Sequence, residues 1–196
     1  MPRIEIVVDA GECPDPESLA ELADVMWWRA APAAPPASAD LACRWLVDAG
    51  EDCPAPDAGG PDGLLRLADG SLESVAAARD AAPDAGWIPR AVIARRPRRY
   101  RLQEAAGESG FRCYAPDFTS VRDWTVAGSG LPLGQWLRRA AELGLDRVWL
   151  HSLEAERDGR GLDLDAIAHA ALHYQGAVWV AGGVAEAAHL ENLARA

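Results

Sequence analysis

Acidic and histidine residues stand at the ends of several short apolar runs in the sequence. Asp9 ends RIEIVVD, Asp117 follows FRCYAP, and His151 ends DRVWLH. In a parallel sheet with intervening helices, ligands bind at the carboxyl ends of the strands, so these side chains could meet around one substrate. Two carboxylates could act there as general base and general acid, and a neutral imidazole could exchange a proton near pH 7. A strand-ending aspartate can also simply cap the next helix, which leaves both roles open.

Two glycine-containing segments in the last third of the sequence could shape a binding site. Gly182 and Gly183 follow the apolar run AVWVA, and bare backbone N–H groups in such a turn favour a phosphate. The segment 154–165, EAERDGRGLDLD, follows the apolar run DRVWL. It is either a solvated loop between a strand and a helix or a loop that contacts a substrate through Asp158 and Gly159.

The elements that must position these residues follow from the alternation of two kinds of segment. Short runs rich in Val, Ile or Trp alternate with alanine- and leucine-rich amphipathic segments, which is typical of βα units around a parallel sheet. We expect strands at 3–9, 24–29, 63–68, 90–95, 111–116, 146–151 and 177–181. We expect helices at 15–22, 39–49, 71–82, 97–107, 131–143, 163–174 and 185–195.

These units predict an α/β fold, a TIM-type (β/α) barrel formed by residues 1–196 as a single domain. A closed barrel of this type has eight strands, and an unclosed one would expose its sheet edges. Because only seven units are recognisable, the eighth strand is missing, supplied by a partner chain, or hidden in a segment assigned as helix. The run LACRWLVDAG, residues 41–50, is the best candidate for a hidden strand.

The composition argues against several classes of function. All 19 basic residues are arginine, which excludes a Schiff-base lysine and the lysine of a P-loop. A formal net charge of −11 argues against nucleic acid as the main partner. The cysteines show no CxxC spacing, and His169 and His173 lack the companions of a helical zinc motif, so we expect no metal and no cofactor. Without a long apolar run or a signal-peptide pattern, we expect a cytoplasmic protein that does not bind membranes.

From residue 111 to about 195 the sequence resembles the second half of the HisA/HisF family, the ProFAR isomerase and imidazole glycerol phosphate synthase cyclase barrels. The resembling features occur in that family's order, and Asp9-Ala10-Gly11 adds a short match near the start. They are Asp117; Asp123-Trp124-Thr125 with Gly128; His151-Ser152; Arg157-Asp158-Gly159 with Gly161 and Leu162-Asp163; and Gly182-Gly183-Val184.

The resemblance implies an acid–base isomerase or lyase that acts on a small phosphorylated metabolite. Asp9 would be the general base and Asp117 the general acid of an aldose–ketose isomerisation, which needs two positioned proton-transfer groups. Trp124 would offer a flat face to a heteroaromatic ring. The other implied site residues are His151, Ser152, Asp158 and Gly159 around the substrate, and Gly182 with Gly183 on one phosphate.

Departures from the family pattern leave the substrate and the activity open. Where the family has a glycine-rich phosphate loop after its third strand, this chain has LADGS, with Asp69 placed to repel an anion. One alternative is a catalytically inactive barrel that serves as a subunit or scaffold in a homo- or hetero-oligomer. Another is a barrel related to the (5-formylfuran-3-yl)methyl phosphate synthases, disfavoured because arginine cannot replace their catalytic lysine.

Overall fold

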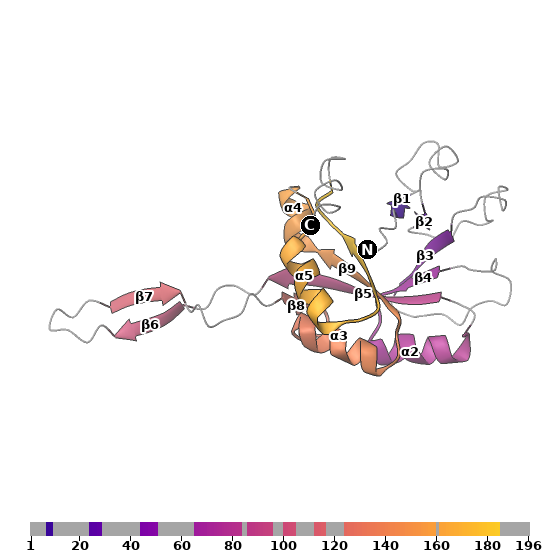
Figure 1. Ribbon diagram of the computed structural model, residues 1–196, viewed down its shortest axis with the longest axis horizontal. Coiled ribbons are helices and arrows are strands. Elements are labelled where there is room, and N and C mark those ends of the chain that lie inside the picture. The colour runs from indigo at the N-terminus through magenta and orange to yellow at the C-terminus, as the bar shows by residue number, and fades with distance from the viewer. Residues whose placement is uncertain are drawn as a thin grey trace.

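A sheet of mainly parallel strands forms the centre of the molecule (Figure 1). The computed structural model describes residues 7–9, 24–28, 44–50, 65–83, 86–95, 100–104, 112–116, 124–159 and 161–184. The strands of the main sheet are β1 (Val7–Asp9), β2 (Val25–Trp28), β3 (Arg44–Gly50), β4 (Leu65–Ala68), β5 (Gly86–Arg95), β8 (Trp124–Val126), β9 (Arg147–Ser152) and β10 (Ala177–Ala181). Their order is β1-β2-β3-β4-β5-β9-β10, with every neighbouring pair parallel, and β8 is antiparallel to β5.

Helices alternate with these strands from β4 onward, as the sequence predicts for an α/β fold. They are α2 (Leu72–Ala81), α3 (Leu133–Glu142), α4 (Leu153–Asp158) and α5 (Leu164–His173). Hydroxyl and carboxylate caps start three of them: Ser71 accepts from Ser74 N at α2, Ser152 from Ala155 N at α4, and Asp163 from Ala166 N at α5. Gly159, in the left-handed conformation, ends α4.

Most predicted elements within the described residues are confirmed. The strands expected at 24–29, 63–68, 146–151 and 177–181 correspond to β2, β4, β9 and β10, and the strand expected at 90–95 is the second half of β5. The helices expected at 71–82, 131–143 and 163–174 correspond to α2, α3 and α5. The helices expected at 15–22 and 185–195 lie outside the described residues, as do residues 3–6 of the first expected strand.

The helix predicted at 39–49 is wrong over its described part, because residues 44–50 form β3. The alternative, a hidden strand within LACRWLVDAG, is confirmed. Alanine, leucine and arginine give this segment a helical composition, but β3 pairs with β2 on one edge and with β4 on the other. Pairing on both edges, together with the burial of Leu46, overrides the local preference.

A second correction concerns residues 100–104 and 112–116, which form a separate two-stranded sheet. Here β6 (Tyr100–Glu104) pairs antiparallel with β7 (Arg112–Pro116), from Tyr100↔Pro116 to Glu104↔Arg112. The helix predicted at 97–107 is therefore wrong over its described part, because the backbone groups of residues 100–104 pair with β7. The strand predicted at 111–116 exists, but it belongs to this hairpin, which lies apart from the main sheet in Figure 1.

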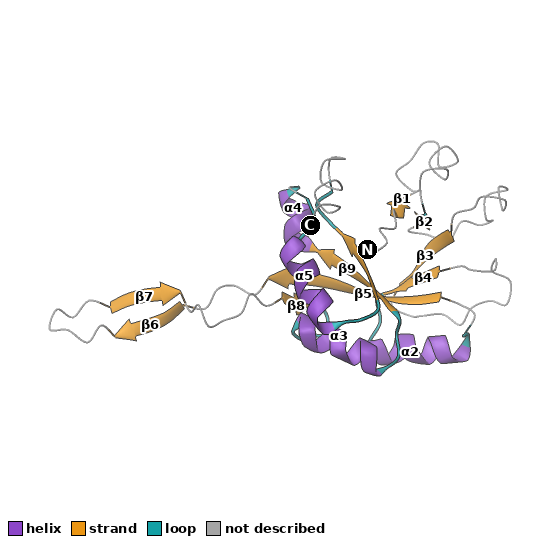
Figure 2. Cartoon of the chain, in the orientation of Figure 1, coloured by secondary structure: helices purple, strands orange, loops and turns teal. Residues whose placement is uncertain are grey.

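Two apolar clusters pack against opposite faces of the main sheet. The larger lies between the sheet and the helices, which gather on one side of the strands in Figure 2, and it includes Val75, Trp87, Ile93, Leu137 and Val148. The smaller lies on the other face, here called the inner face, and contains Val25, Leu46, Leu65, Leu67, Ile88, Trp149 and Trp179.

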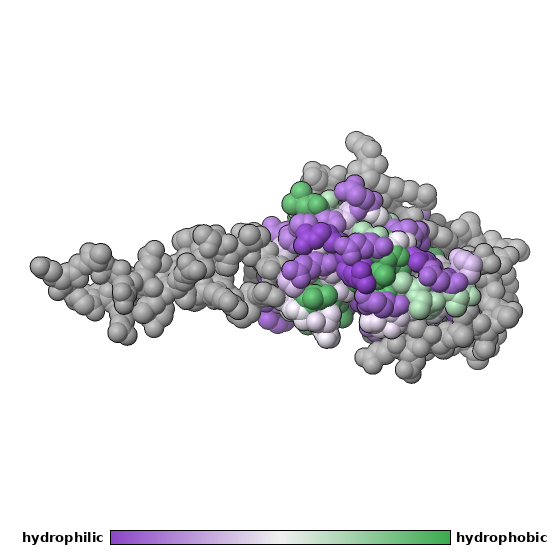
Figure 3. Space-filling view, turned by 90° about the horizontal axis from the view of Figure 1, so that it is seen from below, coloured by the Kyte–Doolittle hydropathy of each residue, from purple (hydrophilic) through white to green (hydrophobic). Residues whose placement is uncertain are grey.

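Seen from the helical side, hydrophilic residues cover most of the described surface and hydrophobic ones are scattered (Figure 3). In the described part of the chain, no helix is long and apolar enough to cross a membrane.

Candidate functional site

Ionisable side chains form a layer at the carboxyl end of the inner face. Successive side chains of a strand point to opposite faces, so a residue two positions beyond an inner apolar residue faces the same side. Four inner apolar residues, Leu46, Leu67, Ile88 and Trp149, are followed at that spacing by an ionisable residue. The resulting set, called the carboxyl-end layer below, consists of Asp48, Asp69, Arg90 and His151.

Arg90 joins two carboxylates of this layer in a half-buried ion cluster. Its Nη1 donates to Oδ2 of Asp48 over 3.0 Å, and its Nε and Nη2 donate to the two carboxylate oxygens of Asp69. The side chains of Arg90, Asp48 and Asp69 are 17%, 16% and 26% exposed. Burial alone would lower the pKa of Arg90, but the hydrogen bonds and charges of the two aspartates raise it above its ordinary value. The predicted repulsion of an anion by Asp69 is therefore offset in part by the paired guanidinium.

His151, in β9, is the remaining member of the carboxyl-end layer, and a carboxylate of α4 contacts its imidazole. Its Nε2 lies 3.0 Å from Oε2 of Glu156, which favours a proton on Nε2. The imidazole borders the glycine turn that follows β10, because a Cβ built on Gly182 would lie 3.3 Å from its Cδ2. His151 is thus a partly exposed imidazole beside the predicted phosphate turn.

The glycine turn after β10 is closely surrounded by backbone. Gly182 and Gly183 have φ angles of 96° and 89°, in the region that favours glycine. A Cβ on Gly183 would lie 2.2 Å from the carbonyl oxygen of Gly161, and one on Gly182 would lie 2.6 Å from that of Ser152. Gly161 N also donates to Gly183 O over 2.8 Å. Both positions therefore require glycine for conformation and for space.

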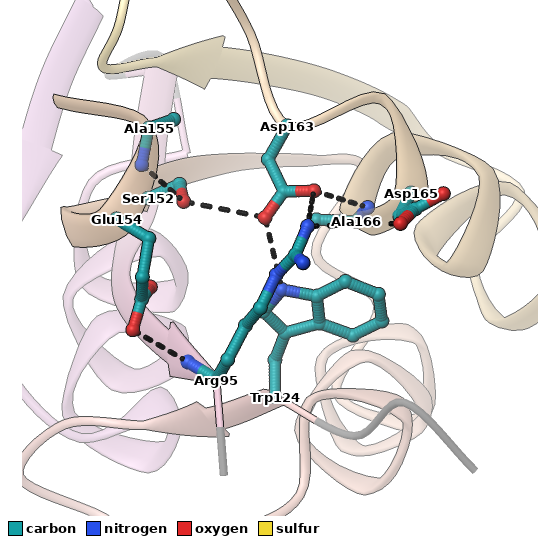
Figure 4. A network of polar contacts seen from close by, with 8 residues as sticks. All are labelled: Arg95, Trp124, Ser152, Glu154, Ala155, Asp163, Asp165 and Ala166. Atoms are coloured by element: carbon teal, nitrogen blue, oxygen red, sulfur yellow. Dashed lines mark hydrogen bonds and ion pairs between the residues drawn. The ribbon is translucent and has the colours of Figure 1, made fainter. Parts of the chain in front are cut away.

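Ser152 and Trp124 lie in a buried network on the helical side of the sheet (Figure 4). Trp124 Nε1 donates to Oδ2 of Asp163 over 3.1 Å, and Ser152 Oγ donates to the same oxygen over 3.4 Å. Arg95 Nη2 and Ala166 N donate to Oδ1 of Asp163 over 3.0 and 3.1 Å. The guanidinium of Arg95 also lies over the Trp124 ring, 5.7 Å from its centroid.

This network keeps the Asp163 carboxylate ionised despite its burial. The side chain is 3% exposed, and burial alone would raise its pKa. The hydrogen bonds from Arg95, Ala166 N and Trp124 outweigh burial, so the pKa of Asp163 lies below its ordinary value. Asp163 thereby fixes the start of α5 against the ends of β5, β8 and β9.

The other predicted site residues fall at exposed or undescribed positions. Asp158 is exposed and accepts from Nε of Arg157 over 3.0 Å, and Gly159 follows it as the exposed cap of α4. Asp9 ends β1 in register with Trp27, and its side chain lies outside the described part. Asp117 lies outside the described residues, directly after β7. The structure therefore brings His151 close to the glycine turn and Ser152 close to Trp124, and it leaves the roles of all nine residues as predictions.

Sequence reasoning missed three residues that organise these contacts: Asp48, Arg90 and Asp163. Asp48 lay in the segment predicted as a helix, and Arg90 was taken only as the first residue of a strand. The signal that could have found them is an ionisable residue two positions beyond a buried one in a strand, which requires correct strand assignments. Asp163 had a readable signal, a helix-capping position, but its partners come from distant segments. Within the described residues, no group of three or more His, Cys, Asp or Glu side chains could hold a metal ion.

Comparison with known proteins gives a partial similarity. No protein-family model matches the chain. Over 62 residues it is 36% identical to imidazole glycerol phosphate synthase subunit HisF of Streptomyces coelicolor (strain ATCC BAA-471 / A3(2) / M145). The similar segment covers 32% of this chain and 25% of that protein, so the chain matches about a quarter of the relative's length. The similarity supports a HisF-like relationship for that part of the chain.

Proposed function

We propose that the chain is a HisA/HisF-like (β/α) barrel that carries out acid–base chemistry on a small phosphorylated metabolite at the carboxyl ends of its parallel strands. The observation that carries this proposal is the carboxyl-end layer. Asp48, Asp69, Arg90 and His151 take the inner-face positions beyond an apolar floor, which is where parallel α/β folds bind ligands. The partial similarity to HisF and the parallel strand order support the same proposal.

Proton transfer is assigned first to Asp9 and His151. Asp9 is the last residue of β1 and His151 is the last but one of β9, and the hydrogen bond to Glu156 orients the imidazole of His151. In an aldose–ketose isomerisation, one group removes a proton from the carbon beside the carbonyl, and a second protonates the carbonyl oxygen. Asp117 remains a second candidate for the acid, although the strand that precedes it belongs to the β6–β7 hairpin.

The phosphate of the substrate is assigned to the turn of Gly182 and Gly183. This turn follows the parallel strand β10 and borders His151. Glycine allows a phosphate to approach the backbone closely, and backbone N–H groups donate to it. A phosphate there would set the reacting carbons of a short sugar near His151.

The partly buried ion cluster of Arg90 would contact the end of the substrate remote from the phosphate. Its two carboxylates and one guanidinium carry a net charge of −1 when all are ionised. Hydroxyl groups or an amine would find acceptors there, whereas a second phosphate would meet two carboxylates. The proposed substrate therefore carries one phosphate rather than two.

Solvent isotope exchange tests the proposal without knowledge of the product. The full chain is incubated in D₂O with a panel of phosphorylated aldoses and ketoses, and proton NMR follows deuterium uptake at the carbon beside the carbonyl. We expect uptake for one class of sugar monophosphate, and a loss of about 10²-fold or more in His151→Asn. His173→Asn, which changes a histidine at the end of α5, is the matched control and should retain the rate. No uptake with any member of the panel, together with no phosphate binding, would overturn the proposal.

A second candidate is a subunit of a larger assembly, with or without catalysis. The described path of the main sheet ends at β1 on one side and β10 on the other, and such strands can pair with another chain. The HisF relative is itself named as a subunit of a synthase. Light scattering coupled to size-exclusion chromatography tests this candidate, which predicts a stable oligomer or a complex; a monomer at all concentrations argues against a homo-oligomer.

A further inference from the structure

Among the described residues, Asp163 is the most heavily hydrogen-bonded buried charge outside the carboxyl-end layer. Its two carboxylate oxygens accept four hydrogen bonds, two each, from donors in β5, β8, β9 and α5. Such a set exceeds what a helix cap needs, because Ala166 N alone completes the cap. The remaining three donors tie the start of α5 to the sheet.

Residues 161–163, which precede α5, lie directly against the glycine turn. Gly161, two residues before Asp163, donates its N–H to Gly183 O over 2.8 Å, and its own carbonyl fills the space where a Gly183 side chain would begin. The carbonyl of Ala155, in α4, lies 2.6 Å from the same point. The shape of the turn therefore depends on where the 161–163 segment and α4 are held.

Asp163 holds both neighbours of the glycine turn, the 161–163 segment and α4. Ser152 donates to Oδ2 of Asp163 and accepts from Ala155 N over 3.3 Å, which fixes the start of α4. Arg95 donates to Oδ1 of Asp163, and its own backbone N–H donates to Oε1 of Glu154 over 3.0 Å, which ties α4 to the end of β5. Figure 4 shows the side chains of Arg95, Trp124 and Ser152 converging on this one carboxylate.

We infer that Asp163 is a positioning residue that holds the Gly182–Gly183 turn in its binding shape through Gly161 and Ser152. The inference deepens the proposed function and rests on it for the identity of the ligand, a phosphate. Asp163 itself is buried and does not contact the ligand. Arg95 and Trp124 act with it by fixing its two oxygens.

Two variants and one matched control test the inference in the full chain. Asp163→Asn keeps the size of the side chain but cannot accept two hydrogen bonds at each terminal atom. Trp124→Phe removes the indole donor and keeps a smaller aromatic ring in the core. As the control, Asp165→Asn removes the same charge two residues further along the chain, from an exposed carboxylate whose Oδ2 lies 3.6 Å from Nη2 of Arg95.

The measurements are an NMR titration with inorganic phosphate and amide hydrogen exchange without phosphate. We expect phosphate to shift the Gly182 and Gly183 amides in the natural chain and in Asp165→Asn. In Asp163→Asn and Trp124→Phe we expect phosphate to bind about tenfold more weakly, and the Gly161 amide to exchange faster.

The two readouts separate this inference from the proposed function. If phosphate leaves the glycine turn of the natural chain unshifted while Gly161 exchanges faster in the two variants, the phosphate assignment fails and the positioning role stands. If both folded variants match the natural chain in phosphate affinity and in Gly161 exchange, the inference is overturned. Should Asp163→Asn not fold, Trp124→Phe alone decides by the same two measurements.

Discussion

Arg90 in β5 donates from Nη1 to Oδ2 of Asp48 in β3 over 3.0 Å, across the intervening strand β4. The same guanidinium holds Asp69, directly after β4, so three neighbouring strands share one ion cluster at their carboxyl ends. A partly buried charge of this kind is costly to leave unpaired, so removal of the guanidinium would leave both carboxylates without the cation that they share.

Arg90→Met should destabilise the chain by about 2–3 kcal/mol at pH 7, because it leaves two carboxylates close together without a cation. Urea unfolding followed by circular dichroism at pH 7 measures this loss of stability.

Arg157→Met provides the control for the arginine change. Arg157 pairs with Asp158 on the exposed surface of α4, so its loss should cost less than about 0.5 kcal/mol. An equal loss of stability in Arg90→Met and Arg157→Met would show that the half-buried cluster contributes no more to stability than a surface ion pair does.

Gly183→Ala should destabilise the chain by at least about 2 kcal/mol more than Gly128→Ala. Both glycines have a positive φ, 89° and 77°, so alanine carries a similar backbone strain at each. Only at Gly183 does the new Cβ meet backbone, 2.2 Å from Gly161 O, whereas nothing lies within 4 Å at Gly128. Urea unfolding of the two variants makes the comparison, and similar midpoints would contradict the close packing of the glycine turn.

Acid should remove the stability that the Asp163 carboxylate contributes. Its pKa is lowered in the folded chain, so this contribution is present above the unfolded pKa, about 3.9, and is lost as the pH falls towards the folded pKa. Asp163→Asn should therefore be less stable than the natural chain by about 2 kcal/mol at pH 7, with the difference narrowing below about pH 4. Unfolding curves from about pH 7 to about pH 2.5 follow this difference in stability. A difference that stays constant through this range would mean that it does not arise from the ionisation of Asp163.

Much of the parallel sheet could be predicted from local sequence, and the exceptions have a physical cause. The Val-, Leu- and Trp-rich runs of β9 and β10 are typical of buried strands. Val148, Trp149 and Leu150 of β9 are buried as this pattern predicts, whereas only Trp179 of β10 is buried. The composition of β3 and β6 is instead that of a helix, and pairing with distant strands decides their structure. No local pattern reveals such pairing, which also explains why the strand before Asp117 could not be assigned to the hairpin.

The same limit applies to the candidate site. Single residues at strand ends, such as His151 and Gly182, could be identified because the ends of those strands could be predicted. The partners of Arg90 lie 21 and 42 residues away, and the contact between Arg95 and Asp163 spans 68 residues. Those contacts depend on the order of strands in the sheet, which the sequence does not reveal until the strands are correctly paired.

Tyr174 should make the chain sensitive to alkali. Its hydroxyl is buried and donates to Leu145 O over 2.6 Å; burial first, and then the nearby charge of Asp146, raise the pKa of the phenol despite the opposing charge of Arg147. A raised folded pKa contributes stability that is fully present below the unfolded pKa, about 10, and is lost as the pH rises above it. At pH 7, Tyr174→Phe should be less stable than the natural chain by about 1 kcal/mol, because the hydrogen bond to Leu145 O is missing. Between pH 9 and about pH 11, the stability of Tyr174→Phe should fall less than that of the natural chain. Urea unfolding at these pH values measures both differences in stability, and ultraviolet absorbance follows the formation of the phenolate. An equal fall in the stability of the two chains would show that Tyr174 ionises as freely in the folded state as in the unfolded one.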